Sequence, residues 1–351
     1  MWRPTTVANR DVLSAARLNF DEIPIVDLTP LFEPNSEALT RLVESVREIC
    51  RNIGFFYIKN HRVPTNAINT LLLETERFFR LPLETKLVYD IGKLRRHRGY
   101  VPVGALCADP DAEPDMQEAF EVALELPEDD PDYVAGSPIY GPNVWPTELP
   151  EFEQDVYSYF EHMLALGRTL FRLFALTLDL PETFYDKEIS KPMAQLRLIH
   201  YPTTKHRPSA SGSLGVGAHT DYECFTILWQ KQSGLQVQNP AGIWIEAPPI
   251  ADTFVINIGD MLQRWTNDLF VSTPHRVINR SDRKRYSFPF FFGTNYETVV
   301  KCLEHCCGPD NPPRYPPTKC GYWTENMHTY SYVYRHPDRG KLPDPELSQN
   351  L

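Results

Sequence analysis

The first half of the chain repeats hydrophobic residues at helical spacing. Residues 37–52 and 65–79 each place apolar side chains three or four positions apart, so that one face of each helix is apolar. The longest such run covers residues 151–180, and Pro181 ends it because proline cannot continue a helix. A further run covers residues 323–334. These patterns predict four main helices, with the longest near the middle of the chain.

A different pattern begins near residue 194. Short apolar or alternating runs follow one another as far as about residue 300, and turn residues separate many of them. These runs cover residues 196–201, 226–230, 235–239, 243–247, 253–258, 276–279 and 285–292. The pattern predicts a mainly β fold with flanking α-helices, built around a double-stranded β-helix of the jelly roll or cupin type.

These patterns divide the chain into four parts. Residues 1–125 form a mixed α/β region that packs on the barrel, and residues 126–193 hold a proline-rich loop and the long helix. Residues 194–300 form the barrel core, and residues 301–351 form a C-terminal loop and helix. We expect one compact catalytic unit, because large β-barrel enzymes often run as one domain at this length of 351 residues.

Composition narrows the functional class. The formal net charge of −11 disfavours nonspecific binding to nucleic acid, which needs a basic face. No apolar run approaches the length of a membrane span. The seven cysteines have no zinc-binding spacing, which favours reduced thiols in a cytoplasmic protein. The first twenty residues contain three arginines and no continuous apolar core, so they are no secretory signal, and a targeting segment or a terminal arm both stay open.

The most informative residues are His219 and Asp221, which are followed 54 positions after Asp221 by His275. Residues i and i+2 of a strand point to the same side, so we expect His219 and Asp221 to share one face of a strand and to reach one metal ion. A second histidine from a distant strand completes a set of two histidines and one carboxylate, which is typical of non-haem Fe(II) oxygenases. By itself the tripeptide His219-Thr220-Asp221 is also compatible with a structural His–Asp pair.

A second pair, Arg285 and Ser287, lies ten residues beyond His275 and shares one face of the next predicted strand. Arginine binds a carboxylate through two parallel hydrogen bonds, and a hydroxyl can add a third. The pair therefore predicts an anchor for a carboxylate. The alternative is a surface arginine beside a core serine, but the mostly apolar run 286–292 favours a pocket.

With these motifs in place, the chain resembles the isopenicillin N synthase-like group of Fe(II)/2-oxoglutarate-dependent dioxygenases. Short segments occur in the order seen in that family: residues 23–28, 54–61, 77–82, 98–100, 198–202, 234–237 and 257–260. The resemblance implies that His219, Asp221 and His275 bind Fe(II), and that 2-oxoglutarate chelates the metal while Arg285 and Ser287 hold its far carboxylate. In relatives, the residue matching Tyr201 approaches that carboxylate.

The resemblance implies oxidation of a small molecule by O2, with release of succinate and CO2. Hydroxylation, desaturation and ring formation all stay open, and the substrate class includes amino acids, peptides and secondary metabolites. Three side chains are candidates for substrate contact. Arg98 belongs to a basic run with Arg95 and Arg96 that forms either an electropositive lip or a solvated loop; Tyr100 follows it, and Phe291 shares the face of Arg285.

Two alternatives remain open from the sequence. One is an Fe(II) oxidase of the isopenicillin N synthase type, which uses O2 without 2-oxoglutarate and directs its Arg-x-Ser pair to the substrate. The other is a non-catalytic cupin-like binding protein. In every case we expect no membrane or nucleic-acid partner, and a monomer or weak homo-oligomer.

Overall fold

The computed structural model describes residues 22–332 apart from 34, 95–96, 107–114, 203–213 and 279–283, together with residue 335. The expectations for the first twenty residues, and for Arg95 and Arg96, therefore lie outside the described residues.

The four predicted helices are present, with ends that differ by a few residues. They are α1 (Ser36–Asn52), α2 (Thr65–Phe79), α5 (Phe152–Thr177) and α7 (Cys320–Ser331). The side chain of Asn35 begins α1 by accepting a hydrogen bond from the Ala38 amide. Short helices α3 (Leu83–Lys86), α4 (Pro131–Val134) and α6 (Asp260–Trp265) lie in the connections.

The strands form two sheets of the barrel and a separate two-stranded ribbon of β13 (Val299–Val300) and β14 (Thr318–Lys319). The large sheet has the order β1 (Ile25–Asp27), β2 (Phe55–Lys59), β10 (Thr253–Ile258), β7 (Phe225–Gln230), β12 (Arg285–Asn295), β5 (Pro192–Tyr201), β4 (Glu118–Ala123) and β3 (Gly99–Val101). The small sheet has the order β6 (Leu214–His219), β11 (His275–Ile278), β8 (Leu235–Gln238) and β9 (Trp244–Glu246).

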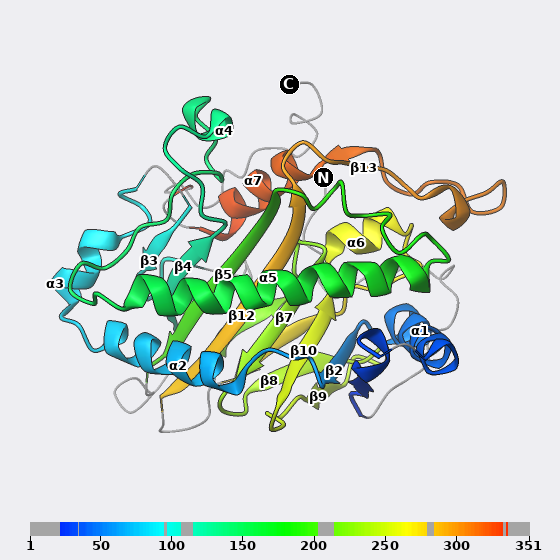
Figure 1. Ribbon diagram of the computed structural model, residues 1–351, viewed down its shortest axis with the longest axis horizontal. Coiled ribbons are helices and arrows are strands. Elements are labelled where there is room, and N and C mark those ends of the chain that lie inside the picture. The colour runs from blue at the N-terminus through cyan, green and yellow to red at the C-terminus, as the bar shows by residue number, and fades with distance from the viewer. Residues whose placement is uncertain are drawn as a thin grey trace.

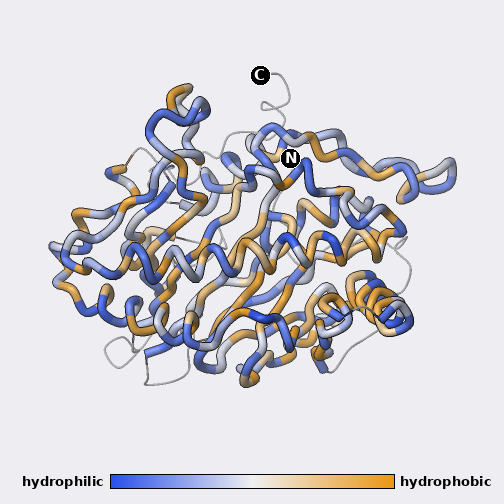
Figure 2. The backbone as a smooth tube through the Cα atoms, viewed as in Figure 1, coloured by the Kyte–Doolittle hydropathy of each residue, from blue (hydrophilic) through white to orange (hydrophobic). Residues whose placement is uncertain are grey.

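Each face of the large sheet buries a different core. Helices α2 and α5 cover its outer face (Figure 1), and there Phe288, Phe290 and Phe292 of β12 pack with the helices. Gly167 lets α5 approach closely, because a Cβ on it would lie 2.1 Å from the Phe292 ring. The inner face packs against the small sheet through side chains such as Val255 and Val237. Hydrophobic positions accordingly run along the central strands (Figure 2).

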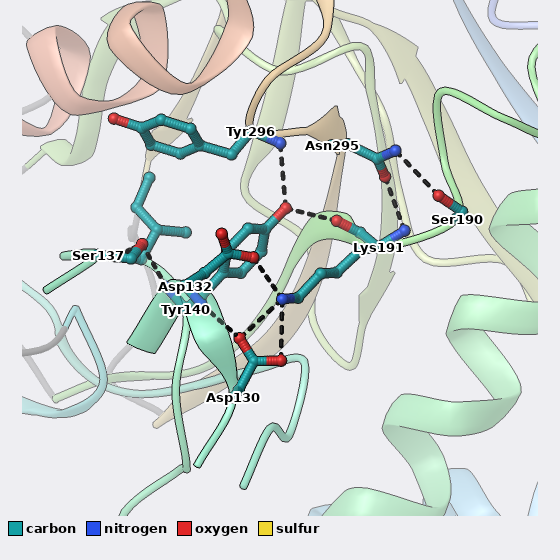
Figure 3. A network of polar contacts seen from close by, with 9 residues as sticks. Asp130, Asp132, Ser137, Tyr140, Ser190, Lys191, Asn295 and Tyr296 are labelled. Atoms are coloured by element: carbon teal, nitrogen blue, oxygen red, sulfur yellow. Dashed lines mark hydrogen bonds and ion pairs between the residues drawn. The ribbon is translucent and has the colours of Figure 1, made fainter. Parts of the chain in front are cut away.

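A polar network fastens the connection that precedes α5 to the barrel (Figure 3). The ammonium group of Lys191 binds Asp130 at 2.8 Å and also Asp132, and its bond to Asp130 lowers the pKa of that carboxyl group. The Lys191 amide donates to Asn295 at 2.7 Å, so the end of β12 joins the same network. This network has a structural role, since its polar groups are bonded to one another at the entry to β5.

Candidate active site

Two histidines face each other across neighbouring strands of the small sheet. His219 ends β6, and His275 begins β11 directly opposite it in the antiparallel register. Their ring centroids lie 4.3 Å apart. The expectation that His219 and Asp221 share a strand is wrong, because β6 stops at His219 and Asp221 lies in the loop that leads to β7.

The three side chains nevertheless converge on one point. The Oδ1 atom of Asp221 lies 3.5 Å from Nε2 of His219 and 3.6 Å from Nε2 of His275. One ligand atom from each residue falls within 4.8 Å of the other two, so the group could hold a metal ion. A shared centre between one carboxylate oxygen and two ring nitrogens suits a divalent transition metal and leaves further coordination positions open.

Main-chain carbonyl groups fix the orientation of both imidazoles. Nδ1 of His219 lies 2.8 Å from the Gly217 carbonyl oxygen, and Nδ1 of His275 lies 3.2 Å from that of Thr273. A carbonyl only accepts, so Nδ1 donates in each ring and Nε2 of the neutral ring keeps its lone pair for a metal. Burial, together with the neighbouring imidazole of His219, lowers the pKa of His275 to about 4, which keeps the His275 ring neutral at physiological pH.

The two oxygens of Asp221 have separate partners. Oδ1 faces the histidines, while Oδ2 accepts hydrogen bonds from the Thr226 hydroxyl and, at 2.7 Å, from Nδ2 of Asn257. Burial alone would raise the pKa of Asp221, but the two imidazoles and the Thr226 hydrogen bond outweigh burial and hold the pKa well below its ordinary value. The carboxylate is therefore ionised and oriented before any metal binds.

The loop that carries Asp221 rests on the corner between β10 and α6. The Asp260 amide donates to the Asp221 carbonyl oxygen at 2.8 Å, and the Thr220 hydroxyl donates to the Asp260 carboxylate at 3.1 Å. Gly259 is required at this corner, because a Cβ on it would lie 2.2 Å from the Glu223 carbonyl oxygen. The corner therefore sets the position of the carboxylate even though no strand does.

Arg285 and Ser287 lie on the inner face of β12, where Arg285 is 1% exposed. The guanidinium group donates to the Ser287 hydroxyl at 3.1 Å and to Gln230 at 3.2 Å, and it lies 4.6 Å from the centre of the Tyr201 ring. Its Nε has no hydrogen-bond partner among the described residues, and none of their carboxylates pairs with it. Burial lowers the pKa of Arg285, which reflects a cation without a neighbouring anion.

The positions of Arg98 and Tyr100 contradict the prediction that these two side chains contact the substrate. Arg98 is 1% exposed and donates to Asn143 at 3.0 Å, to Leu124 at 3.2 Å and to the Ile139 carbonyl oxygen, so it is neither an electropositive lip nor a solvated loop. The Tyr100 hydroxyl donates to Glu118 at 2.6 Å in the outer core. Neither side chain faces the metal-binding group.

Phe291 differs from both, because it faces inward with Arg285 and Ser287 and is only partly buried. Its ring lies 5.2 Å from the guanidinium carbon of Arg197 on β5. Sequence reasoning missed Arg197, although Arg197 shares its side of β5 with Tyr201. It also gave no functional role to Asn257, the β10 residue that orients Asp221.

Comparisons with known proteins agree with this geometry. The family described as "non-haem dioxygenase in morphine synthesis N-terminal" matches residues 23–148, and the 2OG-Fe(II) oxygenase superfamily matches residues 192–294. The 2-oxoglutarate-Fe(II) type oxidoreductase hxnY of Emericella nidulans is 36% identical to this chain over 88% of the chain and 90% of its own length. The chain belongs to the 2-oxoglutarate- and Fe(II)-dependent oxygenase family.

Other members of the family extend the comparison. Clavatol oxidase of Penicillium crustosum is 37% identical over 80% of this chain and 88% of its own. The structure of a Neurospora crassa protein in complex with 2-oxoglutarate and thymine matches with a TM-score of 0.76 and 27% identity, and covers 88% of this chain and 96% of that one. The predicted double-stranded β-helix and enzyme class are confirmed, and Fe(II) and 2-oxoglutarate are the cofactor and co-substrate of this oxygenase.

Helix α5 has 26 residues, and its buried face packs on the large sheet of this oxygenase. No helix within the described ranges is long and apolar enough to cross a membrane.

Proposed function

We propose that His219, Asp221 and His275 bind Fe(II) in this oxygenase, and that Arg285, Ser287 and Tyr201 bind the far carboxylate of 2-oxoglutarate. The observation that carries the proposal is that the two carboxylate oxygens of Asp221 have separate roles. Oδ1 faces the Nε2 atoms of both histidines, while Oδ2 accepts hydrogen bonds from Thr226 and Asn257. When bound, Fe(II) couples O2 and 2-oxoglutarate to substrate oxidation, with succinate and CO2 as products.

The surroundings of Arg285 support its assignment. Its positive charge is buried and meets only the neutral groups of Ser287, Gln230 and Tyr201 among the described residues. A buried cation without an anion is unfavourable, so a dicarboxylate that reaches both Arg285 and the metal supplies the missing charge. Gln230 is itself held by a 2.7 Å bond to the Ala247 carbonyl oxygen, which keeps the arginine aligned.

We further propose that the primary substrate is a small planar molecule that contacts Phe291 and undergoes hydroxylation, desaturation or ring formation. The half-buried ring of Phe291 on the inner wall supports this class. The Neurospora crassa protein supplies the same kind of support, because the thymine bound to it is a planar ring compound.

The remaining assignments concern the state of the protein. We propose one catalytic unit that acts in the cytoplasm as a monomer or weak homo-oligomer. The cysteines of the described part of the chain are all free, as expected in a reducing compartment.

The test is anaerobic reconstitution with Fe(II), followed by addition of O2 and a succinate assay over a panel of planar small molecules. We expect His219→Ala, Asp221→Ala and His275→Ala to abolish iron binding and succinate formation. His305→Ala, at an exposed position away from the barrel, is the matched control and should behave as wild type. Full activity in any of the three variants would reject the metal site.

A further inference from the structure

A buried ion pair lies on the inner wall of the barrel, outside the metal and 2-oxoglutarate sites. Glu121 of β4 and Arg197 of β5 are direct partners in the sheet register, and Nε of Arg197 lies 3.0 Å from Oε1 of Glu121. The Tyr332 hydroxyl donates to the same oxygen and accepts from Nη2 of Arg197, while Gln195 donates to Oε2. The carboxylate is thus fully occupied, whereas Nη1 of Arg197 bonds none of the residues that the structure describes.

The sheet register places this ion pair within reach of the metal-binding group. Gln195, Phe291 and Thr226 are partners in one row across β5, β12 and β7, and the Thr226 hydroxyl bonds Asp221. Neighbouring strands lie about 4.8 Å apart, so two steps separate Gln195 from Thr226 by about 10 Å. A molecule of one or two rings could contact Arg197 and still present a carbon to the metal.

The space beside Arg197 has a mixed lining. Val101, Leu106, Gln117, Ala119, Glu121 and Arg197 line one small pocket. Gln117 is 3% exposed, and its Oε1 has no hydrogen-bond partner among the described residues. Because buried polar atoms are normally satisfied, an unpaired acceptor in a pocket indicates a missing donor. Arg197 and Gln117 both border this pocket, and each keeps one polar atom without a partner among the described residues: the donor Nη1 of Arg197 and the acceptor Oε1 of Gln117.

The charge of the pocket selects among ligands. Glu121 balances the charge of Arg197, unlike Arg285, which has no such partner. The stacked rings of His97 and His328 lie next to Tyr332 and carry no charge at neutral pH, since burial lowers the pKa of both well below its ordinary value. A carboxylate would enter a balanced site and lose its hydration without gaining a counter-ion, whereas a neutral carbonyl group needs only a hydrogen-bond donor.

We propose that Arg197, held by Glu121 and Tyr332, binds the carbonyl oxygen of an uncharged planar substrate through Nη1, while Gln117 accepts an N–H or O–H from the same molecule and Phe291 packs against its ring. This inference rests on the proposed function, because it assigns the substrate site of that oxygenase. It identifies Arg197 and Gln117 as specificity-determining residues.

The test compares three probes of similar size: benzamide, benzoate and toluene. Binding is measured by calorimetry on the full chain with Fe(II) and 2-oxoglutarate under anaerobic conditions, where no turnover occurs. We expect the wild type to bind benzamide at least about tenfold more tightly than benzoate or toluene, since about 1.4 kcal/mol is tenfold and matches a hydrogen bond to a charged donor. Equal affinities, or no binding of any probe, would overturn the proposal.

Variants separate recognition from structure. Arg197→Lys should lose most of the benzamide preference, whereas the matched change Arg172→Lys, on the solvent side of α5, should keep it. Glu121→Gln removes the balancing charge and should shift the preference to benzoate. If Arg197→Lys kept the wild-type preference, the ion pair would only join β4, β5 and the end of α7.

A variant outside the ion pair keeps the proposal testable if changes to Arg197 or Glu121 prevent folding. Gln117→Leu removes an unpaired buried acceptor and so leaves no partner unsatisfied. It should weaken benzamide about fivefold and leave toluene unchanged, and an unchanged benzamide affinity would contradict the role of Gln117. Succinate formation by the wild type is measured separately, so failure of the proposed function would be seen as a loss of iron- and 2-oxoglutarate-dependent turnover, independently of probe binding.

Discussion

Arg98 and Arg285 are equally buried, each 1% exposed, but their surroundings differ. The Arg98 donors go to the carbonyl oxygens of Ile139 and Leu124 and to Asn143, all of which belong to the protein scaffold. Arg285 has a hydroxyl, an amide and an aromatic face around it, and its Nε is unpaired among the described residues. Burial alone does not identify a functional arginine; the partners of its donors do.

This difference has an energetic meaning. Arg98 satisfies main-chain carbonyl groups that would otherwise lack this donor, so its interactions contribute to folding. Arg285 keeps a desolvated charge that the described protein groups only partly stabilise, so the folded protein gains free energy when an anion arrives. The first arginine should therefore affect stability, and the second should affect ligand binding.

Replacement of Arg98 should give the largest effect. Arg98→Leu removes the donor of three acceptors on the scaffold, and we expect a loss of about 3 kcal/mol in the free energy of unfolding. Urea denaturation measures this loss. Arg285→Leu should lose less than about 1 kcal/mol in the same assay, because no anion among the described residues is left behind. Equal losses in the two variants would remove the distinction between the two arginines.

The next largest effect should be the gain in the free energy of unfolding when 2-oxoglutarate binds. With Fe(II) present and 2-oxoglutarate at about one hundred times its Kd, the wild type should gain about 2.7 kcal/mol of stability. The gain should persist in Arg98 variants that still fold and should be absent in Arg285→Leu. The measurement is the unfolding midpoint with and without 2-oxoglutarate, and a full gain in Arg285→Leu would assign the carboxylate to another residue.

The KM for 2-oxoglutarate should also depend on Arg285, the arginine assigned to ligand binding. Arg285→Gln loses the charge but keeps a donor, and we expect the KM for 2-oxoglutarate to rise about thirtyfold, equivalent to about 2 kcal/mol. The KM of the primary substrate should change little. If the KM of the primary substrate rose instead, Arg285 would hold that substrate, as in an oxidase that uses no 2-oxoglutarate.

The sequence predicted several barrel strands after residue 194 because their pattern of apolar residues is local, whereas it did not predict β3 or β4. Strand β10 was predicted with its observed bounds and β12 with its observed start, so Arg285, Ser287 and Phe291 were correctly expected on one face. The convergence of His219, Asp221 and His275 was also predicted, although the loop position of Asp221 was not. That loop depends on contacts with Gly259 and Asp260, which lie far away in the sequence.

Other parts of the site could not be obtained from local pattern. Arg98 lies just before the short strand β3, and Tyr100 lies within it. The sequence does not indicate which side of such a short strand faces the helices. The roles of Asn257 and Thr226 come from strand pairing between β10 and β7, which brings both side chains to Oδ2 of Asp221. Arg197 was within reach of sequence reasoning, since it has the same strand parity as Tyr201.

The smallest expected effect comes from replacing one neighbour of each arginine: Ser287 beside Arg285 and Asn143 beside Arg98. The Ser287 hydroxyl accepts from Nη1 of Arg285 at 3.1 Å and can still donate its own hydrogen to a carboxylate. Its loss should raise the KM for 2-oxoglutarate about fivefold, equivalent to about 1 kcal/mol, and leave stability nearly unchanged. Asn143→Ala near Arg98 removes one of the partners of that arginine and should instead lower stability without changing that KM. If Ser287→Ala changed stability and Asn143→Ala changed the 2-oxoglutarate requirement, the assignment of one arginine to folding and the other to binding would be wrong.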